Sequence, residues 1–263
     1  MSYARRVQPS GMPQLAEEKR NWEEFAAQDP FWAVLAQPDR KYGRWEREDF
    51  YRTGEAQIAE VMDHAAQFDR PRRHEAALDF GSGVGRLTRA LAGRFDRAVG
   101  VDISQTMVDN ATRFNADVPN VSFEVNARPD LRVFDDASFD LVNTRIVLQH
   151  LPDRATIEGY LAEFLRVLRP GGVLVFQLPS ALPVALRLQP RRNAYLVLRR
   201  LGFSPHFLYW RLGLHPNRMV AIPKPDVVAF LESNGAGVLD VVTRRDPDVH
   251  LFEESVYYVA EDS

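Results

Sequence analysis

The sequence predicts an α/β fold in which a mainly parallel sheet lies between two layers of helices. Three observations support this prediction. Short β-type runs alternate with amphipathic helical stretches between residues 75 and 178, as in strand–helix–strand units. A glycine-rich loop follows the first run, and a helical pattern starts directly after it. The last two β-type runs are joined by a segment too short for a parallel crossover, so we expect them to pair antiparallel.

The N-terminal zone, residues 1–74, has the apolar spacing of helices and is rich in aromatic residues. It opens without the apolar segment of a secretory signal, and no apolar run in the chain approaches the length of a membrane span. We therefore expect a cytoplasmic protein without a transmembrane segment.

The core zone, residues 75–178, contains five β-type runs, namely AALDF, AVGVD, VSFEV, FDLVNT and GVLVFQL. A proline-punctuated insertion at 179–225 then interrupts the alternation. The pattern resumes in residues 226–263 with a helix near 225–233 and the runs GVLDVVTRR and ESVYYVA, which flank the short segment DPDVH. We expect this last zone to complete the sheet of the core.

The composition is that of an ordinary globular protein, with 45% hydrophobic and 26% charged residues in 263. The net charge of −3 gives no global electrostatic reason to bind nucleic acid. The absence of cysteine excludes disulfides, thiolate zinc sites and a cysteine nucleophile.

The most specific segment is ALDFGSGVGRLT, residues 77–88, in which a buried strand leads into Gly81, Gly83 and Gly85 and a helix follows. Glycine allows a sharp turn and lets a ligand approach the backbone closely. The start of the helix offers unpaired N–H groups and the positive end of its dipole. The segment predicts a ligand-binding loop, although the same glycines also suit a tight strand-to-helix turn without a ligand.

Asp102 ends the second β-type run, 21 residues after Gly81. In nucleotide-binding α/β folds a carboxylate at this place accepts hydrogen bonds from the ribose hydroxyls. Its alternative role is to cap the helix that begins near Ser104. The glycine loop and Asp102 together leave two ligand classes, dinucleotides and S-adenosylmethionine.

The spacing of the loop separates these two classes. A dinucleotide loop reads G-x-G-x-x-G/A, whereas here Arg86 stands at the third small position and Gly85 comes one residue early. Asp79 lies in the strand just before the loop. A carboxylate there would repel a pyrophosphate but suits the cationic aminoacyl end of S-adenosylmethionine, directly or through the loop backbone. The residues therefore favour S-adenosylmethionine.

Four segments resemble the class I S-adenosylmethionine-dependent methyltransferase superfamily, especially its bacterial small-molecule enzymes. LDFGSGVGRLT resembles the first motif, VGVDIS the second, DASFDLVNTRIVLQHLPD the fourth strand with its loop, and FLRVLRPGGVLVFQLP a helix, a Pro-Gly-Gly turn and the fifth strand. The resemblance covers about residues 45–178. It implies a three-layer Rossmann-like fold whose seven-stranded sheet has an antiparallel last strand. We expect an N-terminal helical lid and an inserted cap in addition.

The resemblance also defines a predicted cofactor site. Its residues lie in or next to the motifs and are Asp79, Gly81, Ser82, Gly83, Gly85, Asp102, Ile103, Met107, Asn126, Ala127, Arg145 and Gln149. Many relatives have an acidic residue near the adenine, whereas this chain reads NARP at that place, and this is why Asn126 and Ala127 are included. The Asn/Asp-Pro-Pro-Tyr segment used to methylate base amines is absent, and NTRI stands there instead. Nucleic acid is therefore disfavoured as the acceptor.

The loop after the fourth β-type run carries Arg145, Gln149 and His150, at the strand end where α/β folds bind ligands. We predict that His150 is a general base or orients the acceptor. The alternative for His150 and Gln149 is a role in packing or in ordering the turn.

Two further segments are predicted to face the acceptor. WEREDFYRTG at 45–54 resembles the lid helix of the superfamily, with Phe50 and Tyr51 towards the substrate; the alternative is an amphipathic helix that buries both rings. The insertion contributes Tyr195 and Tyr209.

The charge of the insertion differs from that of the remaining chain. Residues 180–225 have a formal charge of +8 and no acid, whereas the rest has 25 cations and 36 acids, a charge of −11. Arginines interleaved with apolar residues suit an anionic or lipid-like acceptor, or an anionic membrane surface. They also suit a solvated helical face.

These observations predict methyl transfer from S-adenosylmethionine to an oxygen, nitrogen or carbon nucleophile of a small molecule, without a metal. The cofactor supplies the electrophile, so the protein mainly has to hold donor and acceptor in line in a dry pocket. The alternatives are a non-catalytic S-adenosylmethionine-binding regulatory protein and a nicotinamide-dependent oxidoreductase.

Overall fold

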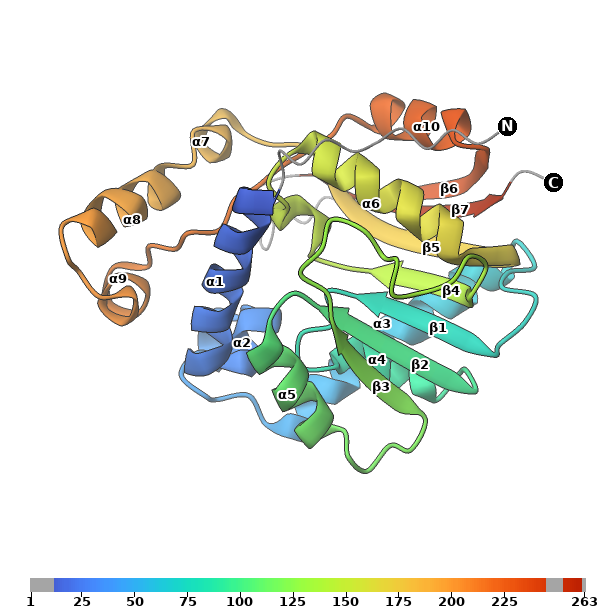
Figure 1. Ribbon diagram of the computed structural model, residues 1–263, viewed down its shortest axis with the longest axis horizontal. Coiled ribbons are helices and arrows are strands. Elements are labelled where there is room, and N and C mark those ends of the chain that lie inside the picture. Colours follow the sequence, from blue (N-terminus) through green and yellow to red (C-terminus); the bar gives the residue numbers. More distant parts are fainter. Residues whose placement is uncertain (1–11, 245–252, 262–263) are drawn as a thin grey trace.

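A seven-stranded sheet forms the centre of the computed structural model, which describes residues 12–244 and 253–261 (Figure 1). The strands are β1 (Ala76–Phe80), β2 (Arg97–Asp102), β3 (Val121–Val125), β4 (Phe139–Thr144), β5 (Leu168–Ala181), β6 (Ala236–Arg244) and β7 (Glu253–Glu261). Their order in the sheet is β3-β2-β1-β4-β5-β7-β6. Strands β1 to β5 pair in parallel, and β7 pairs antiparallel with both β5 and β6. The predicted seven-stranded sheet with an antiparallel last strand is confirmed.

The strands agree with the expected runs, with one difference in β5. This strand already starts at Leu168, which pairs with Phe139 ahead of a shift in register. The Pro-Gly-Gly segment therefore lies inside the strand and not in a turn before it. The segment DPDVH, expected to join the last two strands, lies outside the described residues.

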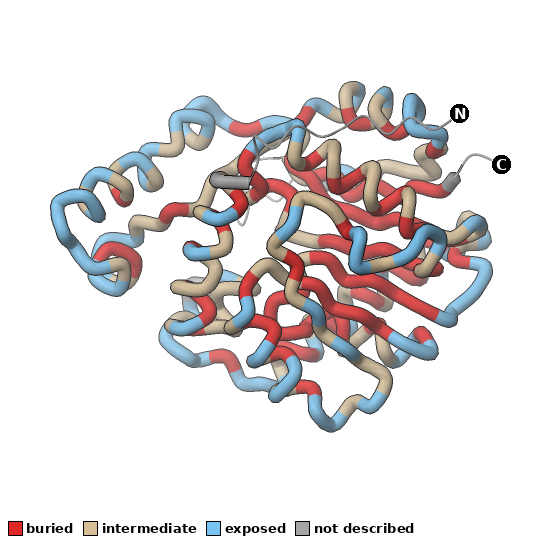
Figure 2. The backbone as a smooth tube through the Cα atoms, viewed as in Figure 1, coloured by how far each residue is buried: buried red, intermediate tan, exposed pale blue. Residues whose placement is uncertain are grey.

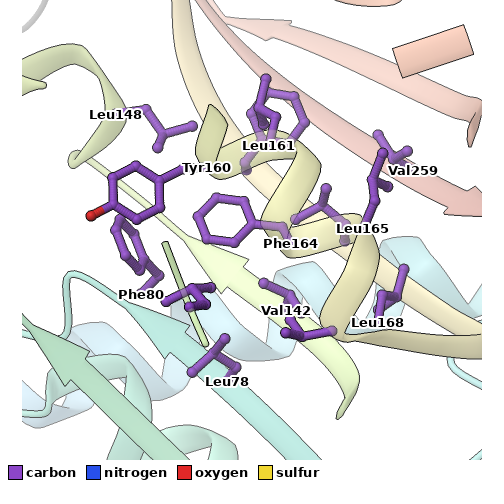
Figure 3. Close-up of a cluster of buried hydrophobic side chains, with 14 of the residues drawn as sticks. Leu78, Phe80, Val142, Leu148, Tyr160, Leu161, Phe164, Leu165, Leu168 and Val259 are labelled. Atoms are coloured by element: carbon purple, nitrogen blue, oxygen red, sulfur yellow. The ribbon is translucent and has the colours of Figure 1, made fainter. Parts of the chain in front are cut away.

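Helices cover both faces of the sheet and extend beyond one of its ends. They are α1 (Met12–Gln28), α2 (Pro30–Val34), η2 (Pro38–Arg40), α3 (Arg47–Ala66), α4 (Arg86–Ala92), α5 (Gln105–Phe114), η3 (Leu148–His150), α6 (Arg154–Val167), α7 (Val184–Arg187), α8 (Pro190–Arg200), α9 (Pro205–Leu212) and α10 (Lys224–Ser233). One face packs against α3 and α4, and the other against α6 and α10. Figure 3 shows Phe164 and Leu165 of α6 above Val142 in this second core. The predicted three-layer arrangement is confirmed.

The N-terminal zone divides into two parts. Ile58, Val61 and Ala65 of α3 pack against the sheet beside α4, so α3 belongs to a layer of the core. Residues 12–46, which we call the α1–α2 segment, instead lie across the carboxyl ends of the strands. Glu23 of α1 fixes them there by accepting hydrogen bonds from backbone N–H groups at the start of α5.

The insertion leaves the sheet after β5 and returns to it at α10. Its helices α7, α8 and α9 stand beyond the end of the sheet next to α1 (Figure 1). Most of their residues are exposed, in contrast to the strands (Figure 2). Across the described ranges, no helix is both long enough and apolar enough to span a bilayer.

Candidate cofactor and acceptor site

The glycine loop leaves β1 and turns back beside β2 before α4 begins. Gly81, Gly83 and Gly85 have φ angles of 75°, 53° and 83°, in the left-handed region that favours glycine. The N–H groups of Gly81 and Ser82 donate to the carbonyl of Val101 over 2.7 and 3.0 Å. The loop is therefore a fixed turn at the carboxyl ends of β1 and β2, where open α/β sheets bind ligands.

Asp102 ties this loop to the end of β2. Its Oδ2 accepts a hydrogen bond from the N–H of Gly83 and its Oδ1 accepts one from the N–H of Ser104, each over 2.9 Å. Ser104 is itself the cap of α5, because its hydroxyl accepts from the N–H of Met107. Burial raises the pKa of the Asp102 carboxyl to about 6. Ile103 is half-buried next to it, and Met107 is fully buried.

Asp79 is buried behind the loop. Its Oδ2 accepts a 2.7 Å hydrogen bond from the hydroxyl of Thr88 in α4, and its Oδ1 accepts one of 3.4 Å from the amide of Asn143 in β4. Burial raises the pKa of Asp79 to about 6, against the opposing effect of these hydrogen bonds and of the Arg86 guanidinium. Because Asp79 is only 2% exposed, its predicted influence on a cofactor runs through the loop backbone.

Two valines cover the glycine loop. A Cβ added to Gly83 would lie 2.3 Å from Cγ2 of Val34 in α2, and one added to Gly81 would lie 2.2 Å from Cγ2 of Val147. The α1–α2 segment and the loop after β4 therefore approach the glycine loop from two sides. A side chain at either glycine would displace this cover as well as strain the turn.

His150 lies in η3, between α1 and the insertion. Its Nδ1 is 2.8 Å from the carbonyl oxygen of Arg218, and its ring meets that of Trp22 edge-on. Because a carbonyl oxygen only accepts, Nδ1 carries the proton and Nε2 keeps its lone pair. Burial lowers the pKa of the imidazole, so the ring is neutral at pH 7. A neutral ring in this tautomer can accept a proton at Nε2.

His215 was missed by the sequence analysis. It comes from the insertion, and its pKa is lowered to about 4 by burial and by the charges of His150 and Arg191 nearby. Its buried Nδ1 has no hydrogen-bond partner among the described residues. His150 and His215 are thus both neutral at pH 7, and His150 is among the groups that influence the pKa of His215. The sequence offered no signal for His215 beyond its residue type, because no motif spacing relates a histidine of the insertion to a histidine in the loop after β4.

Gln149 and Arg145 come from the same loop but lie in different surroundings. The buried Gln149 accepts a 2.8 Å hydrogen bond from the N–H of Val220 at its backbone carbonyl, whereas its side-chain Oε1 has no partner in the described part of the chain. Burial lowers the pKa of Arg145, opposed by Tyr258 and Glu254 of β7. Arg145 therefore lies towards β7, and Gln149 offers an unused buried acceptor.

The family model of the methyltransferase domain matches residues 78–176, which include the glycine loop, Asp102 and the loop after β4. We refer to this matched segment, residues 78–176, as the methyltransferase domain.

The relatives of the methyltransferase domain include several named enzymes. The trans-aconitate 2-methyltransferase of Deinococcus radiodurans is 34% identical over 139 residues, which are 52% of this chain and 50% of that protein. The 2-methyl-6-phytyl-1,4-hydroquinone methyltransferase of a Synechocystis species is 36% identical over 99 residues, 37% of this chain and 30% of that protein. The chain thus spans half or less of the length of these curated relatives.

The fold of the chain is found among solved methyltransferases. Magnesium protoporphyrin IX methyltransferase from Synechocystis, solved with bound S-adenosylhomocysteine, superposes with a TM-score of 0.61 at 17% identity. The superposition covers 94% of this chain and 99% of that one. The architecture is accordingly that of class I S-adenosylmethionine-dependent methyltransferases, as the resemblance implied.

The aromatic residues of α3 pack behind the methyltransferase domain. Phe50 has no exposed surface, and its ring contacts Phe31 and Trp45. Tyr51 is also buried, and its hydroxyl donates to the carbonyl of Val84 in the glycine loop over 3.2 Å. Both rings therefore have the packing role that was the alternative to facing a substrate, because α3 presents them inward to the α1–α2 segment.

Asn126 organises the loop after β3 in the methyltransferase domain. Its Nδ2 donates to the carbonyl of Asp130 over 2.7 Å, and its Oδ1 accepts from the N–H of Arg128 over 3.1 Å. Its own N–H donates to the carbonyl of Asp102. The side chain is thus used within its loop, and the contact of Asn126 or of the half-buried Ala127 with an adenine stays a prediction.

The insertion meets α1 along a row of ion pairs, which we call the α1 seam. Glu17 pairs with Arg192 over 2.9 Å and with Arg218 over 3.1 Å, and Glu18 pairs with Arg218 over 3.2 Å. Burial raises the pKa of Glu18 to about 7, although Arg218 opposes the shift. The charges of Arg192 and Arg218 are therefore compensated by α1.

Tyr195 and Tyr209 line a narrow crevice between α1 and the insertion. Both are buried; the hydroxyl of Tyr195 donates to Glu24 over 3.2 Å, and the ring of Tyr209 lies 4.8 Å from that of Phe25. Burial raises the pKa of Tyr195 to about 12, so its hydroxyl stays protonated. Their contact with an acceptor stays a prediction.

Proposed function

We propose that the chain transfers a methyl group from S-adenosylmethionine to a small molecule. The cofactor binds on the glycine loop, and the acceptor binds between that loop, α1 and the insertion. The observation that carries the proposal is the 2.9 Å hydrogen bond from Gly83 to Asp102, which joins a ligand-binding turn to a carboxylate suited to a ribose. A cytoplasmic location, favoured by the sequence, belongs to the same proposal.

The residues at the glycine loop fit this cofactor. Glycines without side chains leave the loop backbone accessible, and Asp102 offers acceptor oxygens to ribose hydroxyls. The Oγ of Ser82 and the Oε1 of Gln149 are buried without partners among the described residues, and polar groups of a ligand would satisfy them. When bound, the cofactor supplies a methyl group on a sulfonium, and the chain has to hold the acceptor in line with it and exclude water.

His150 is the residue that we assign to proton transfer. The carbonyl of Arg218 orients its ring, and Nε2 accepts a proton from the acceptor as the methyl group is transferred. His215, whose buried Nδ1 has no partner among the described residues, offers the acceptor a hydrogen bond. Trp22 covers the His150 ring and limits the access of water.

The acceptor in this proposal has anionic or lipid-like character. Relatives that are named for trans-aconitate and for a phytyl hydroquinone support a small molecule. Arg191 acts electrostatically on His215 and pairs with no carboxylate among the described residues. Among the insertion cations without a carboxylate partner, Arg191 is the one that influences His215, and we assign it to a negative group of the acceptor.

Calorimetric titration tests the cofactor site. We expect wild type to bind S-adenosylmethionine and S-adenosylhomocysteine but not NAD. Asp102→Ala should weaken both by roughly 1–3 kcal/mol, because hydrogen bonds to a charged group are lost. The control is Asp109→Ala, which removes an exposed aspartate from nearby α5. Undiminished affinity in Asp102→Ala would remove this residue from the ribose role, and binding of NAD would reject the proposed cofactor.

A second assay tests the transfer itself. Wild-type protein is incubated with methyl-labelled S-adenosylmethionine and a fractionated metabolite extract, and label is sought in small molecules. Labelled product identifies the acceptor and supports the proposal. Tight binding of the cofactor without transfer to any fraction would instead support a non-catalytic binding protein.

A further inference from the structure

The cations of the insertion fall into two sets. The inner set pairs with carboxylates: Arg192, Arg199 and Arg218 contact α1, and Lys224 lies 3.1 Å from Glu253. The outer set is exposed and pairs with no carboxylate among residues 12–244 and 253–261; it consists of Arg187, Arg191, Arg200 and Arg211. Since residues 164–225 contain no acid, the outer surface of the insertion is uniformly positive.

Exposed apolar side chains are concentrated on the same insertion. Among the described residues, nine large hydrophobic side chains are exposed, and seven of them belong to it: Val184, Leu188, Val197, Leu201, Phe203, Phe207 and Leu212. Val184 and Leu201 are the extreme cases, each with 70% of its surface exposed. Single exposed apolar residues are ordinary, but seven in one segment indicate a contact surface.

Five of these seven side chains belong to α8, to α9 or to the turn between them. Val197 and Leu201 are four residues apart and lie on one face of α8, with Arg200 beside them. The turn is ordered, because Arg199 donates a 2.9 Å hydrogen bond to the carbonyl of Phe203. The rings of Phe203 and Phe207 stack at 5.9 Å. Figure 2 shows that this end of the insertion is exposed and stands away from the sheet.

We infer that this face, which we call the α8–α9 face, docks on the surface of an anionic lipid bilayer. It consists of Val197, Arg200, Leu201, Phe203, Phe207 and Arg211. The apolar side chains enter the boundary between headgroups and acyl chains, and the two arginines contact lipid phosphates, as in interfacial amphipathic helices. The segment lies on the membrane and does not cross it, in keeping with helices of only 11 and 8 residues.

Charge and polarity favour this partner over others. A second copy docked through the same face would bring the same arginines against each other, because a two-fold contact is self-complementary. Nucleic acid would satisfy the arginines but leave the apolar side chains without a partner, apart from stacking. An anionic bilayer satisfies both kinds of side chain at once.

Co-sedimentation of the full chain with vesicles tests the inference. One set of vesicles is pure phosphatidylcholine, and the other contains equal parts of phosphatidylcholine and phosphatidylglycerol. Wild type should bind the anionic vesicles at least about tenfold more tightly, and added salt should weaken this binding because it screens the arginines. Equal binding to both sets, or binding to neither, would overturn the inference.

Two variants separate the apolar and cationic contributions. Leu201→Ser/Phe203→Ser and Arg200→Gln/Arg211→Gln should each reduce binding to anionic vesicles by about tenfold or more. The matched control is Val133→Ser/Arg73→Gln, which removes an exposed apolar residue and an exposed cation that lie outside the insertion. Thermal unfolding verifies that every variant is folded. If one of the two test variants does not fold, the other one still tests the inference.

Three outcomes would contradict the inference. The control variant could lower binding as much as the test variants, which would show that binding depends on the general surface charge and not on the α8–α9 face. Both test variants could bind like wild type, which would exclude this face. Wild type could sediment as a dimer that Leu201→Ser/Phe203→Ser dissociates, without vesicle binding, which would make the face a protein interface.

Discussion

At the end of β2, two neighbouring residues have separate tasks. Ser104 caps α5, and Asp102 is thereby available to hold the glycine loop through the N–H of Gly83. His150 shows the same dependence on a neighbour, because the carbonyl of Arg218 determines which ring nitrogen carries the proton. The chemistry that these side chains can perform thus depends on hydrogen bonds from residues that do no chemistry themselves.

His150→Ala tests the proton-transfer role. With the acceptor found by labelled transfer, we expect kcat to fall by about 10²-fold or more, while the affinity for S-adenosylmethionine stays within about twofold of wild type. The control is His74→Ala, an exposed histidine that follows α3. An unchanged kcat would leave His150 with a packing role only.

The pH profile gives a second test at His150. Burial lowers the pKa of its imidazole below the usual value of 6.5, and only the neutral ring accepts a proton. We therefore expect kcat of wild type to stay level as pH decreases to about 6.5 and to fall only below it. An acid limb centred above this value would contradict the assignment.

Among the helices and strands, α1 connects two parts of the molecule that the sheet does not connect, namely α5 and the insertion. Glu23 caps α5 through the N–H groups of Gln105 and Thr106. Glu17 and Glu18, nearer the start of the helix, form the α1 seam with the insertion. A single helix thus joins the cofactor end of the core to the segment that carries the basic surface.

The α1 seam should respond to pH through Glu18. Its pKa is raised from 4.5 to about 7, so protonation favours the folded state. This contribution is fully present below pH 4.5 and is lost as pH rises through about 7. We expect wild type to lose up to roughly 3 kcal/mol of unfolding free energy relative to Glu18→Gln between pH 5 and pH 8.

Urea unfolding over this pH range measures the difference. Glu24→Gln is the matched control, because it removes a more exposed glutamate from the same helix and should leave the pH dependence of wild type intact. A difference between wild type and Glu18→Gln that does not change with pH would show that Glu18 keeps its charge in the folded protein.

At the scale of the whole molecule, the α1–α2 segment touches both the methyltransferase domain and the insertion. Val34 lies on the glycine loop. Lys41 has its ammonium group 4.9–5.5 Å from the centres of four rings, two of its own segment and two of α9, namely Trp32, Tyr42, Tyr209 and Trp210. These contacts act as one cover over the carboxyl ends of the strands.

A ligand under this cover should stabilise the whole chain. A ligand that binds only the folded state at about 100 times its Kd contributes about 2.7 kcal/mol, which corresponds to a rise in Tm of roughly 5–10 °C for a chain of this size. We expect this rise with S-adenosylhomocysteine, together with slower proteolysis of residues 12–46. Asp102→Ala at the same ligand concentration should show a smaller rise. No change in Tm for wild type would contradict binding at the glycine loop.

The sequence by itself determined the layers, the strands and the place of the glycine loop. Alternation of short apolar runs with helical spacing depends on neighbours along the chain, so the strands appear where they were expected. The role of the glycines could be predicted for the same reason. Their positive φ angles are required within a single turn, which depends only on neighbours along the chain.

Only the tertiary structure decided what the individual side chains meet. Tyr51 holds the glycine loop instead of facing a substrate, and His215 lies near His150 although the insertion gave no such signal. Arg218 and Glu18 are 200 residues apart in the chain and form an ion pair. Such pairs follow from how α1 and the insertion pack on the sheet, and no local spacing encodes that packing. The sequence showed how many charges the insertion carries, and the folded chain decided which of them α1 compensates and which remain on the surface.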